Sequence, residues 1–167
     1  MNNTARVLLA ASVALALAAC SKQVKEEPQP EPPAPVETAP VSDGRYTPAD
    51  LDTDSCLRQR TVYFDFDQDV VRPEFQAIMA CHAKYLGDRP GARVTLEGNA
   101  DERGTREYNL GLGERRGNAV SGALQGAGGS AGQITVVSYG EERPVCTESN
   151  ESCWQRNRRV EIVYTVR

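Results

Sequence analysis

The segment 97–120 reads Glu-Gly-Asn-Ala-Asp-Glu-Arg-Gly-Thr-Arg-Glu-Tyr-Asn-Leu-Gly-Leu-Gly-Glu-Arg-Arg-Gly-Asn-Ala-Val, and it joins an expected strand to an expected helix. It places an acid, Asp101, before the helix and a fixed cation, Arg116, fifteen residues later. An arginine fork can grip a carboxylate through two parallel hydrogen bonds, and a carboxylate accepts hydrogen bonds from an ammonium group. The pair can therefore hold the two charged ends of an amino acid, although the spacing alone also fits an internal salt bridge.

Strands and helices are expected to alternate around this segment. Short runs with alternating apolar residues predict four strands, at 61–66, 93–98, 134–139 and 160–166. In the first of these, Val62, Phe64 and Phe66 are expected on one face. Apolar residues at intervals of three and four predict two helices, at about 73–86 and 106–125. This order predicts an α+β sandwich in which the helices pack on one face of a mixed sheet.

Two parts of the central segment resemble a known signature. Ala-Asp-Glu-Arg-Gly-Thr at 100–105 and Leu-Gly-Glu-Arg-Arg at 112–116 resemble the OmpA-like peptidoglycan-binding family, and in particular its peptidoglycan-associated lipoprotein branch. Ser-Tyr-Gly-Glu at 138–141 and Asn-Arg-Arg-Val-Glu-Ile at 157–162 resemble the closing elements of the same branch. The resemblance covers about 61–166 and implies a β-α-β-α-β-β sandwich, in agreement with the pattern of strands and helices.

The resemblance also implies a ligand and a set of ligand contacts. In the family the ligand is diaminopimelate of the peptidoglycan stem peptide, whose free D-centre carries an ammonium group and a carboxylate. The implied contacts on this chain are Phe66, Asp67, Asp101, Arg103, Thr105, Asn109, Leu112 and Arg116. Many members carry histidine where this chain has Asn99, so no charged imidazole is expected there. Arg158 and Arg159 are either further ligand contacts or the solvated start of the last strand, and Trp154 is expected to pack in a loop.

The first 55 residues have the pattern of an export signal followed by a tether. Arg6 precedes an apolar run that ends in Leu-Ala-Ala-Cys at 17–20, which predicts a signal peptide over 1–19 and resembles a bacterial lipobox. The resemblance implies cleavage before Cys20 and its acylation, with Ser21 favouring the outer membrane; an ordinary signal peptide is the alternative. A proline-rich segment then predicts a disordered tether over 20–55, ahead of the domain at 56–167.

The remaining cysteines and the charge balance narrow the possible chemistry. Four cysteines besides Cys20 suit an oxidising compartment and allow three pairings. We favour Cys146–Cys153 and Cys56–Cys81 over four free thiols. His82 is the only histidine and no Cys-x-x-Cys spacing occurs, so no metal or other cofactor is expected. A net charge of -4 without a basic stripe makes nucleic acid an unsuitable partner.

Two classes of function fit these patterns unequally. We favour a non-catalytic outer-membrane lipoprotein whose periplasmic domain links the membrane to peptidoglycan. The resemblance implies membership of the Tol-Pal system, with TolB and other Tol proteins as partners, and a role in envelope integrity and constriction at division. A wall anchor of another envelope complex is the alternative. An enzyme acting on peptidoglycan is disfavoured because no nucleophile–base pair or metal-ligand cluster is evident.

Overall fold

A computed structural model describes residues 43–167. The expected signal peptide, the expected lipidation at Cys20 and most of the expected tether lie outside the described residues. None of the helices within 43–167 is long and apolar enough to cross a membrane.

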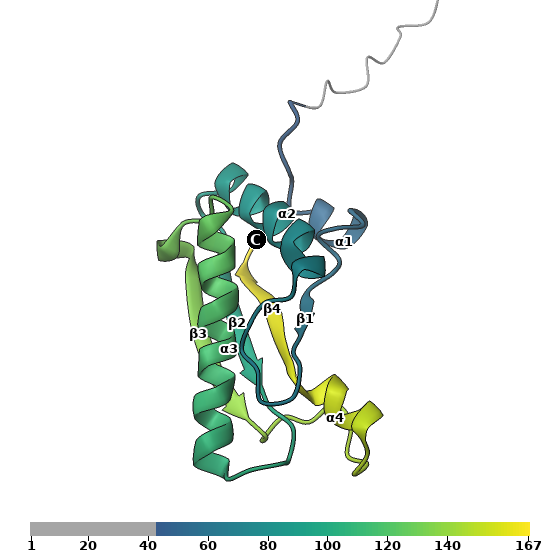
Figure 1. The fold of residues 1–167 in the computed structure, drawn as a ribbon. Coiled ribbons are helices and arrows are strands. Elements are labelled where there is room, and N and C mark those ends of the chain that lie inside the picture. Colours follow the sequence, from purple (N-terminus) through teal and green to yellow (C-terminus); the bar gives the residue numbers. More distant parts are fainter. Residues whose placement is uncertain (1–42) are drawn as a thin grey trace, which may run out of the picture. The chain divides into compact units, whose positions relative to one another are not determined.

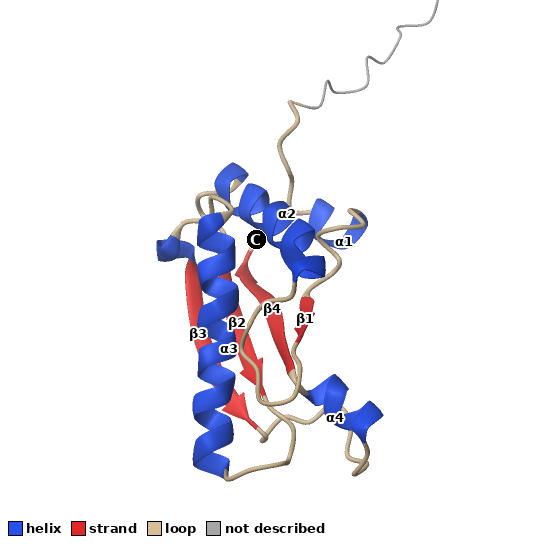
Figure 2. Ribbon diagram, in the orientation of Figure 1, coloured by secondary structure: helices blue, strands red, loops and turns tan. Residues whose placement is uncertain are grey.

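The sheet has four strands in the order β1-β4-β2-β3. Their bounds are Thr61–Tyr63 for β1, Arg93–Asn99 for β2, Ile134–Gly140 for β3 and Arg159–Val166 for β4. β4 is antiparallel to both β1 and β2, and β2 is parallel to β3, so the sheet is mixed as predicted (Figure 2). Because β1 and β2 are both antiparallel to β4, they run in the same direction. Their C-terminal ends therefore lie at the same end of the sheet.

The two long helices lie together on one face of the sheet (Figure 1). α2 spans Gln76–Asp88 after a 3-10 turn at Pro73–Phe75, and α3 spans Arg106–Gly126. Their apolar stripes meet the inward side chains of the strands. The core contains Val62, Phe64, Ile78, Met79, Leu86, Val94, Leu96, Val120, Leu124, Val160 and Ile162. The predicted α+β class and the placement of the helices are therefore confirmed.

α3 approaches the sheet closely because glycines line both sides of the contact. A Cβ built on Gly98 of β2 would lie 1.9 Å from the Gly113 carbonyl oxygen. A Cβ on Gly113 would lie 2.4 Å from Ser138 Oγ of β3, and one on Gly117 would lie 2.5 Å from Val136 Cγ1. No side chain fits at these three points, and between Gly98 and Gly113 the sheet and the helix meet backbone to backbone. This approach fixes where α3 presents Arg116.

Three details of the fold differ from the predictions. β1 ends at Tyr63 rather than Phe66. Phe66 does not share the buried face with Phe64, because 55% of its surface is exposed. The segment expected as a loop around Trp154 instead forms a helix, α4, at Glu151–Asn157.

The folded domain begins earlier than the expected boundary at residue 55. A short helix, α1, spans Asp50–Thr53, and its Leu51 is completely buried. The Tyr46 backbone N–H donates to an Asp88 carboxylate oxygen at 2.9 Å at the end of α2. Cys56 is joined to Cys81 of α2 by one of the two favoured disulfides. Residues 46–55 therefore pack on α2 as part of the domain, and they bury the apolar side chain of Leu51 in its core.

Candidate ligand-binding site

A cavity of about 230 Å³ opens where β1 and β2 end. The residues that line it are Phe66, Asp67, Asp101, Arg103, Gly104, Tyr108, Asn109, Leu112, Arg116 and Arg158. The structure thus brings together seven of the eight predicted contacts, although they come from the loop after β1, the loop after β2 and the first turns of α3. The eighth, Thr105, does not line the cavity. Its side chain caps α3 by accepting from the Tyr108 backbone N–H.

Arg116 is a completely buried cation in the wall of this cavity. Its Nε and two terminal nitrogens donate to the carbonyl oxygens of Gln68, Asn99 and Asp65, at 2.8, 2.9 and 3.1 Å. Desolvation lowers the pKa of Arg116 to about 10, so the group still carries its charge at neutral pH. A guanidinium has five N–H groups, so these three bonds leave two. Arg116 forms no ion pair with a carboxylate of the described chain.

Asp101 has other partners than the expected Arg116. Its Oδ1 accepts from the backbone N–H and Nε of Arg103, and its Oδ2 accepts from Arg103 Nη2 at 2.6 Å and from Arg158 Nη1 at 3.1 Å. Burial raises the pKa of the Asp101 carboxyl, but these hydrogen bonds outweigh it and the net shift is downward. The carboxylate is therefore ionised, and the internal salt bridge that spacing allowed between Asp101 and Arg116 does not form.

Asp67 lines the cavity from the loop after β1. It is the one non-glycine residue within 43–167 with a positive φ, 55°, which aspartate tolerates better than most side chains. Its carboxylate accepts a hydrogen bond from the Tyr108 hydroxyl of α3. Asn109 Nδ2 donates to the Asp101 carbonyl oxygen at 3.1 Å and to a Glu141 carboxylate oxygen. These contacts hold the loops that carry the two carboxylates against the start of α3.

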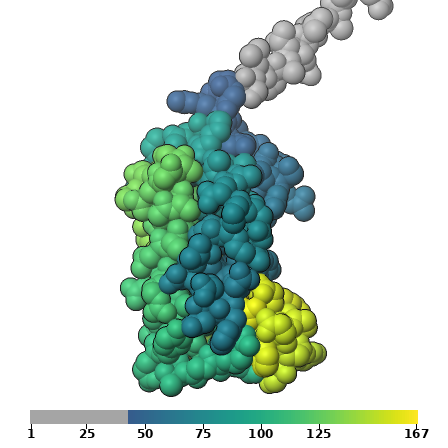
Figure 3. Space-filling model, viewed as in Figure 1, coloured from purple at the N-terminus to yellow at the C-terminus, as the bar shows by residue number. Residues whose placement is uncertain are grey.

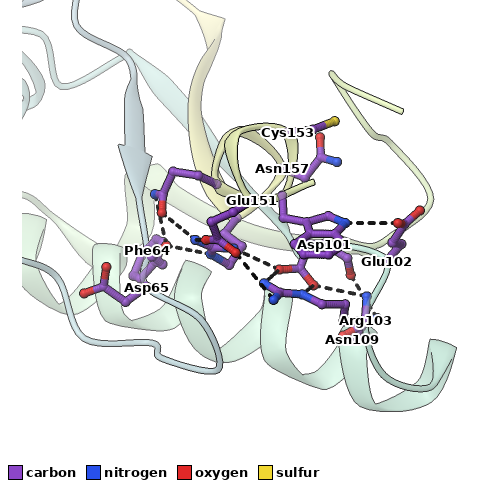
Figure 4. A network of polar contacts seen from close by, with 12 residues as sticks. Phe64, Asp65, Asp101, Glu102, Arg103, Asn109, Glu151, Cys153 and Asn157 are labelled. Carbon is purple, nitrogen blue, oxygen red and sulfur yellow. Dashed lines mark hydrogen bonds and ion pairs between the residues drawn. The ribbon is translucent and has the colours of Figure 1, made fainter. Parts of the chain in front are cut away.

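The Arg103 guanidinium lies between two aromatic rings. Its central carbon is 4.1 Å from the centre of the Phe66 ring and 4.2 Å from that of Trp154. Phe66 and Trp154 come from the loop after β1 and from α4, so the stack connects both to the loop after β2. Figure 4 shows Arg103 in one network of polar contacts with Asp101 and Glu151.

Arg158 is a site residue that the sequence left undecided. It is buried, with 2% of its surface exposed, and it donates to Asp101, to the Phe64 carbonyl oxygen and to Glu151. Arg159 is also buried and pairs with Glu161 at 2.6 Å. The interpretation of both arginines as the solvated start of the last strand is therefore wrong. The sequence shows the arginine pair but not its burial, which arises because β4 lies between β1 and β2.

The second favoured disulfide fastens the segment around α4. Cys146 and Cys153 are bonded, with their Cα atoms 5.3 Å apart. Asn157 holds the same segment, because its side chain accepts from the backbone N–H of Val145 at 2.9 Å and donates to the Cys146 carbonyl oxygen at 2.7 Å. In Figure 3 the α4 segment, in yellow, stands at the end of the domain beside the loop after β1.

Comparison with known proteins identifies the family. The model of the OmpA family matches residues 63–158, more than half of the chain. The chain belongs to the OmpA family. A relative in Haemophilus influenzae, named peptidoglycan-associated lipoprotein, is 42% identical over 98% of this chain and 100% of its own length. A protein of the same name in Pseudomonas putida is 50% identical over 67% of this chain and 68% of its own length.

Solved structures of OmpA-family domains have the same fold. The crystal structure of the peptidoglycan-associated lipoprotein from Burkholderia pseudomallei matches with a TM-score of 0.68 and 44% identity, over 70% of this chain and 98% of that one. The C-terminal domain of Helicobacter pylori MotB matches with a TM-score of 0.59 at 20% identity, over 64% of this chain and 84% of that one, which shows the fold alone. The OmpA family is not an enzyme family, so the expectation of a non-catalytic protein is confirmed.

Proposed function

We propose that this protein is an outer-membrane lipoprotein that binds peptidoglycan non-covalently and links the membrane to the wall. The ligand is the diaminopimelate of the stem peptide, whose free D-centre carries an ammonium group and a carboxylate. The proposal is supported by the relatives, whose name describes proteins of this kind, and by the chemistry of the cavity.

Arg116 is the observation that carries the proposal. A buried cation is costly unless its charge is compensated, and here three carbonyl oxygens hold the guanidinium without an ion-paired carboxylate of the described chain. Its two remaining N–H groups lie on the two terminal nitrogens, the pair that makes parallel hydrogen bonds to a carboxylate. A ligand carboxylate at this point supplies the missing negative charge.

The two aspartates provide for the ammonium group of the same ligand. Asp67 and Asp101 line the cavity with Arg116, from the ends of two strands that run in the same direction. The pKa of Asp101 is lowered, so its carboxylate is charged at any pH near neutrality. One cavity thus offers acceptors for an ammonium and donors for a carboxylate, which suits a zwitterion better than either ion alone.

The remaining parts of the proposed function concern the chain outside the cavity. Acylation of Cys20 provides the membrane anchor, and the proline-rich segment provides the reach from membrane to wall. Weak single contacts suffice, because many anchored copies face a wall that repeats its ligand. The Tol-Pal system is the assembly in which we place the protein, with TolB and other Tol proteins as partners and constriction at division as its setting.

Calorimetric titration of the domain without its lipid anchor tests the ligand assignment. We expect saturable binding of a muropeptide whose stem ends in diaminopimelate. A matched muropeptide with lysine at that position keeps the side-chain ammonium but lacks the second carboxylate, so it should bind at least about tenfold more weakly, a loss of about 1.4 kcal/mol. Asp101→Asn should weaken binding of the first ligand as well.

The possible results of this titration test the contact at Arg116 and the peptidoglycan-binding function separately. Equal affinity for both muropeptides would contradict a carboxylate contact at Arg116. Absence of binding to either muropeptide, by a protein whose circular dichroism shows it folded, would refute the peptidoglycan proposal. Co-purification with TolB from membranes tests the assembly separately, since it does not require the cavity to hold a ligand.

A further inference from the structure

The carboxylate of Asp101 is already fully hydrogen-bonded within the protein. A carboxylate has about four lone-pair positions. Three donors of Arg103 and one of Arg158 already occupy those of Asp101. A ligand ammonium can bond to Asp101 only when one of these donors moves away. This step rests on the proposed function, because it assumes that the ligand carries an ammonium group.

Arg103 is the donor that can move. The side chain of Arg158 is 3% exposed and is held by a backbone carbonyl and two further side chains. The side chain of Arg103 is 30% exposed, and Asp101 is its main polar partner. A second acceptor lies beside it, because Glu151 Oε2 is 3.5 Å from Arg103 Nη1. The guanidinium can therefore turn from Asp101 toward Glu151 while its charge stays paired.

The aromatic rings make that movement possible without releasing Arg103. Stacking on a ring face is less directional than a hydrogen bond to a carboxylate, so Phe66 and Trp154 can hold the guanidinium in both positions. Trp154 is itself fixed, since its Nε1–H donates to Glu102 at 3.0 Å and α4 is closed by the Cys146–Cys153 disulfide. The ring next to Arg103 is thus built into the fold.

We propose that Trp154 is a positioning residue of the binding site. When the ligand binds, the guanidinium of Arg103 moves off the Asp101 carboxylate, which then accepts a hydrogen bond from the ammonium group of the ligand. The ring of Trp154 holds Arg103 during this change of partner. Trp154 does not contact the ligand in this arrangement. It acts through Arg103, whose guanidinium then pairs with the carboxylate of Glu151, so two residues of α4 take part in ligand recognition.

The first test needs no ligand. Carbon-detected NMR titration of the Asp101 carboxyl is compared in the wild type, in Trp154→Ala and in Tyr139→Ala. Tyr139 is the matched control, because its ring stacks with Arg143 at 3.5 Å and does not line the cavity. Loss of the Trp154 ring should loosen Arg103 and raise the pKa of Asp101, whereas the control should titrate like the wild type. Identical titrations of all three proteins would overturn the proposal.

The second test measures affinity for the diaminopimelate-containing muropeptide. Trp154→Ala should weaken binding about five- to tenfold, because a stacked cation contributes about 1 kcal/mol. Trp154→Phe keeps a ring and loses only the N–H, so it should restore affinity to within about twofold of the wild type. Tyr139→Ala should bind unchanged. Wild-type affinity in Trp154→Ala would overturn the proposal; absence of binding by the wild type itself would refute the proposed function instead, while the titration still decides the role of Trp154.

Discussion

His82 is a buried histidine that the binding site does not use. Its Nε2 donates to the Gln59 carbonyl oxygen at 3.1 Å, and its Nδ1 accepts from the Tyr164 hydroxyl at 2.8 Å. Burial lowers the pKa of His82 below the ordinary value of 6.5. Below about pH 6.5 the unfolded chain therefore binds more protons than the folded one, and the stability that His82 contributes above that pH is lost as the pH falls.

This linkage predicts a pH-dependent free energy of unfolding. Free Asp and Glu side chains titrate near pH 4, and the sequence contains no other histidine, so we expect His82 to dominate the side-chain titration between pH 5 and 7. Urea unfolding should show a decrease of up to about 2 kcal/mol between pH 7 and 5. His82→Gln cannot titrate and should show a flatter dependence. Equal stability of the wild type at both values would contradict the assigned neutral, buried imidazole.

Arg116 should not tolerate replacement by lysine. An ammonium on a linear chain cannot reach three carbonyl oxygens and also present two parallel donors to a ligand. Arg116→Lys should weaken muropeptide binding more than about tenfold and lower the free energy of unfolding by about 3 kcal/mol, since charged hydrogen bonds are lost inside the fold. Its neighbour Arg115 is the control, because it is exposed and pairs with Asp69. Similar affinities of Arg116→Lys and Arg115→Lys would contradict the role given to Arg116.

The sequence predicted which residues form the site better than it predicted their contacts. Asp101 and Arg116 both line the cavity, as the motif implied. Their distant partners are Arg158, which lies between α4 and β4, for Asp101 and backbone carbonyls for Arg116, and these contacts depend on the order of strands in the sheet. Spacing along one chain segment carries no information about an arginine that is 57 residues away.

At the scale of elements, the contact between α3 and the sheet can be tested by two glycine-to-alanine substitutions in α3, one inside the contact and one outside it. Glycine in a helix interior ordinarily costs about 0.5–1 kcal/mol relative to alanine. Gly122→Ala should therefore stabilise the protein by up to about 1 kcal/mol, because an added Cβ meets nothing within 4 Å. Gly113→Ala should destabilise it by about 1–3 kcal/mol, because the Cβ would meet Ser138 and Gly98.

Thermal unfolding and muropeptide titration check this pair together. A shift of α3 away from β2 and β3 also displaces Arg116, so Gly113→Ala should weaken binding and Gly122→Ala should not. Stabilisation by both substitutions would show that α3 can move outward at no cost, and the close approach would then not define the site.

The missed helix α4 and the overestimated length of β1 share a physical cause. α4 has seven residues and no periodic apolar stripe, so its stability comes from the Cys146–Cys153 disulfide and from the Asn150 side chain, which caps it by accepting from the Cys153 backbone N–H. β1 pairs with β4 through three residues only, although the alternating run in the sequence is longer. Local pattern predicted α2 and α3 well because each carries its own buried stripe; elements fixed by distant contacts leave no such pattern.

At the scale of the whole domain, the start of the described chain and the cavity lie at opposite ends (Figure 1). The described chain begins beside α1 and α2, whereas the loops after β1 and β2 and the helix α4 lie at the other end (Figure 1). β1 and β2 both run from the first end toward the second. A protein held at its N-terminal side by the membrane and at its cavity by the wall is therefore loaded along these strands, if the proposed function holds.

We predict that the Cys56–Cys81 disulfide influences which strand bears that load. Without it, tension passes from residue 56 into β1, an edge strand with three paired residues, and then into the loop with Phe66 and Asp67. With it, tension crosses at Cys81 into α2 and then into β2, which is paired on both sides and leads to Asp101. We therefore expect the disulfide to lower the tension on the wall of the cavity that Phe66 and Asp67 form.

This path of tension through the disulfide predicts that its loss changes how the protein detaches from peptidoglycan under load. Cys56→Ser/Cys81→Ser should lower the free energy of unfolding by about 3 kcal/mol, as expected for closing a loop of this size. Its affinity for the muropeptide in solution should stay near that of the wild type, because no cavity residue is changed. When single molecules are pulled through their N-terminal end against immobilised peptidoglycan, however, the variant should detach sooner as the load rises. Equal detachment at every load would mean that β1 withstands the tension unaided, and the disulfide would then serve equilibrium stability alone.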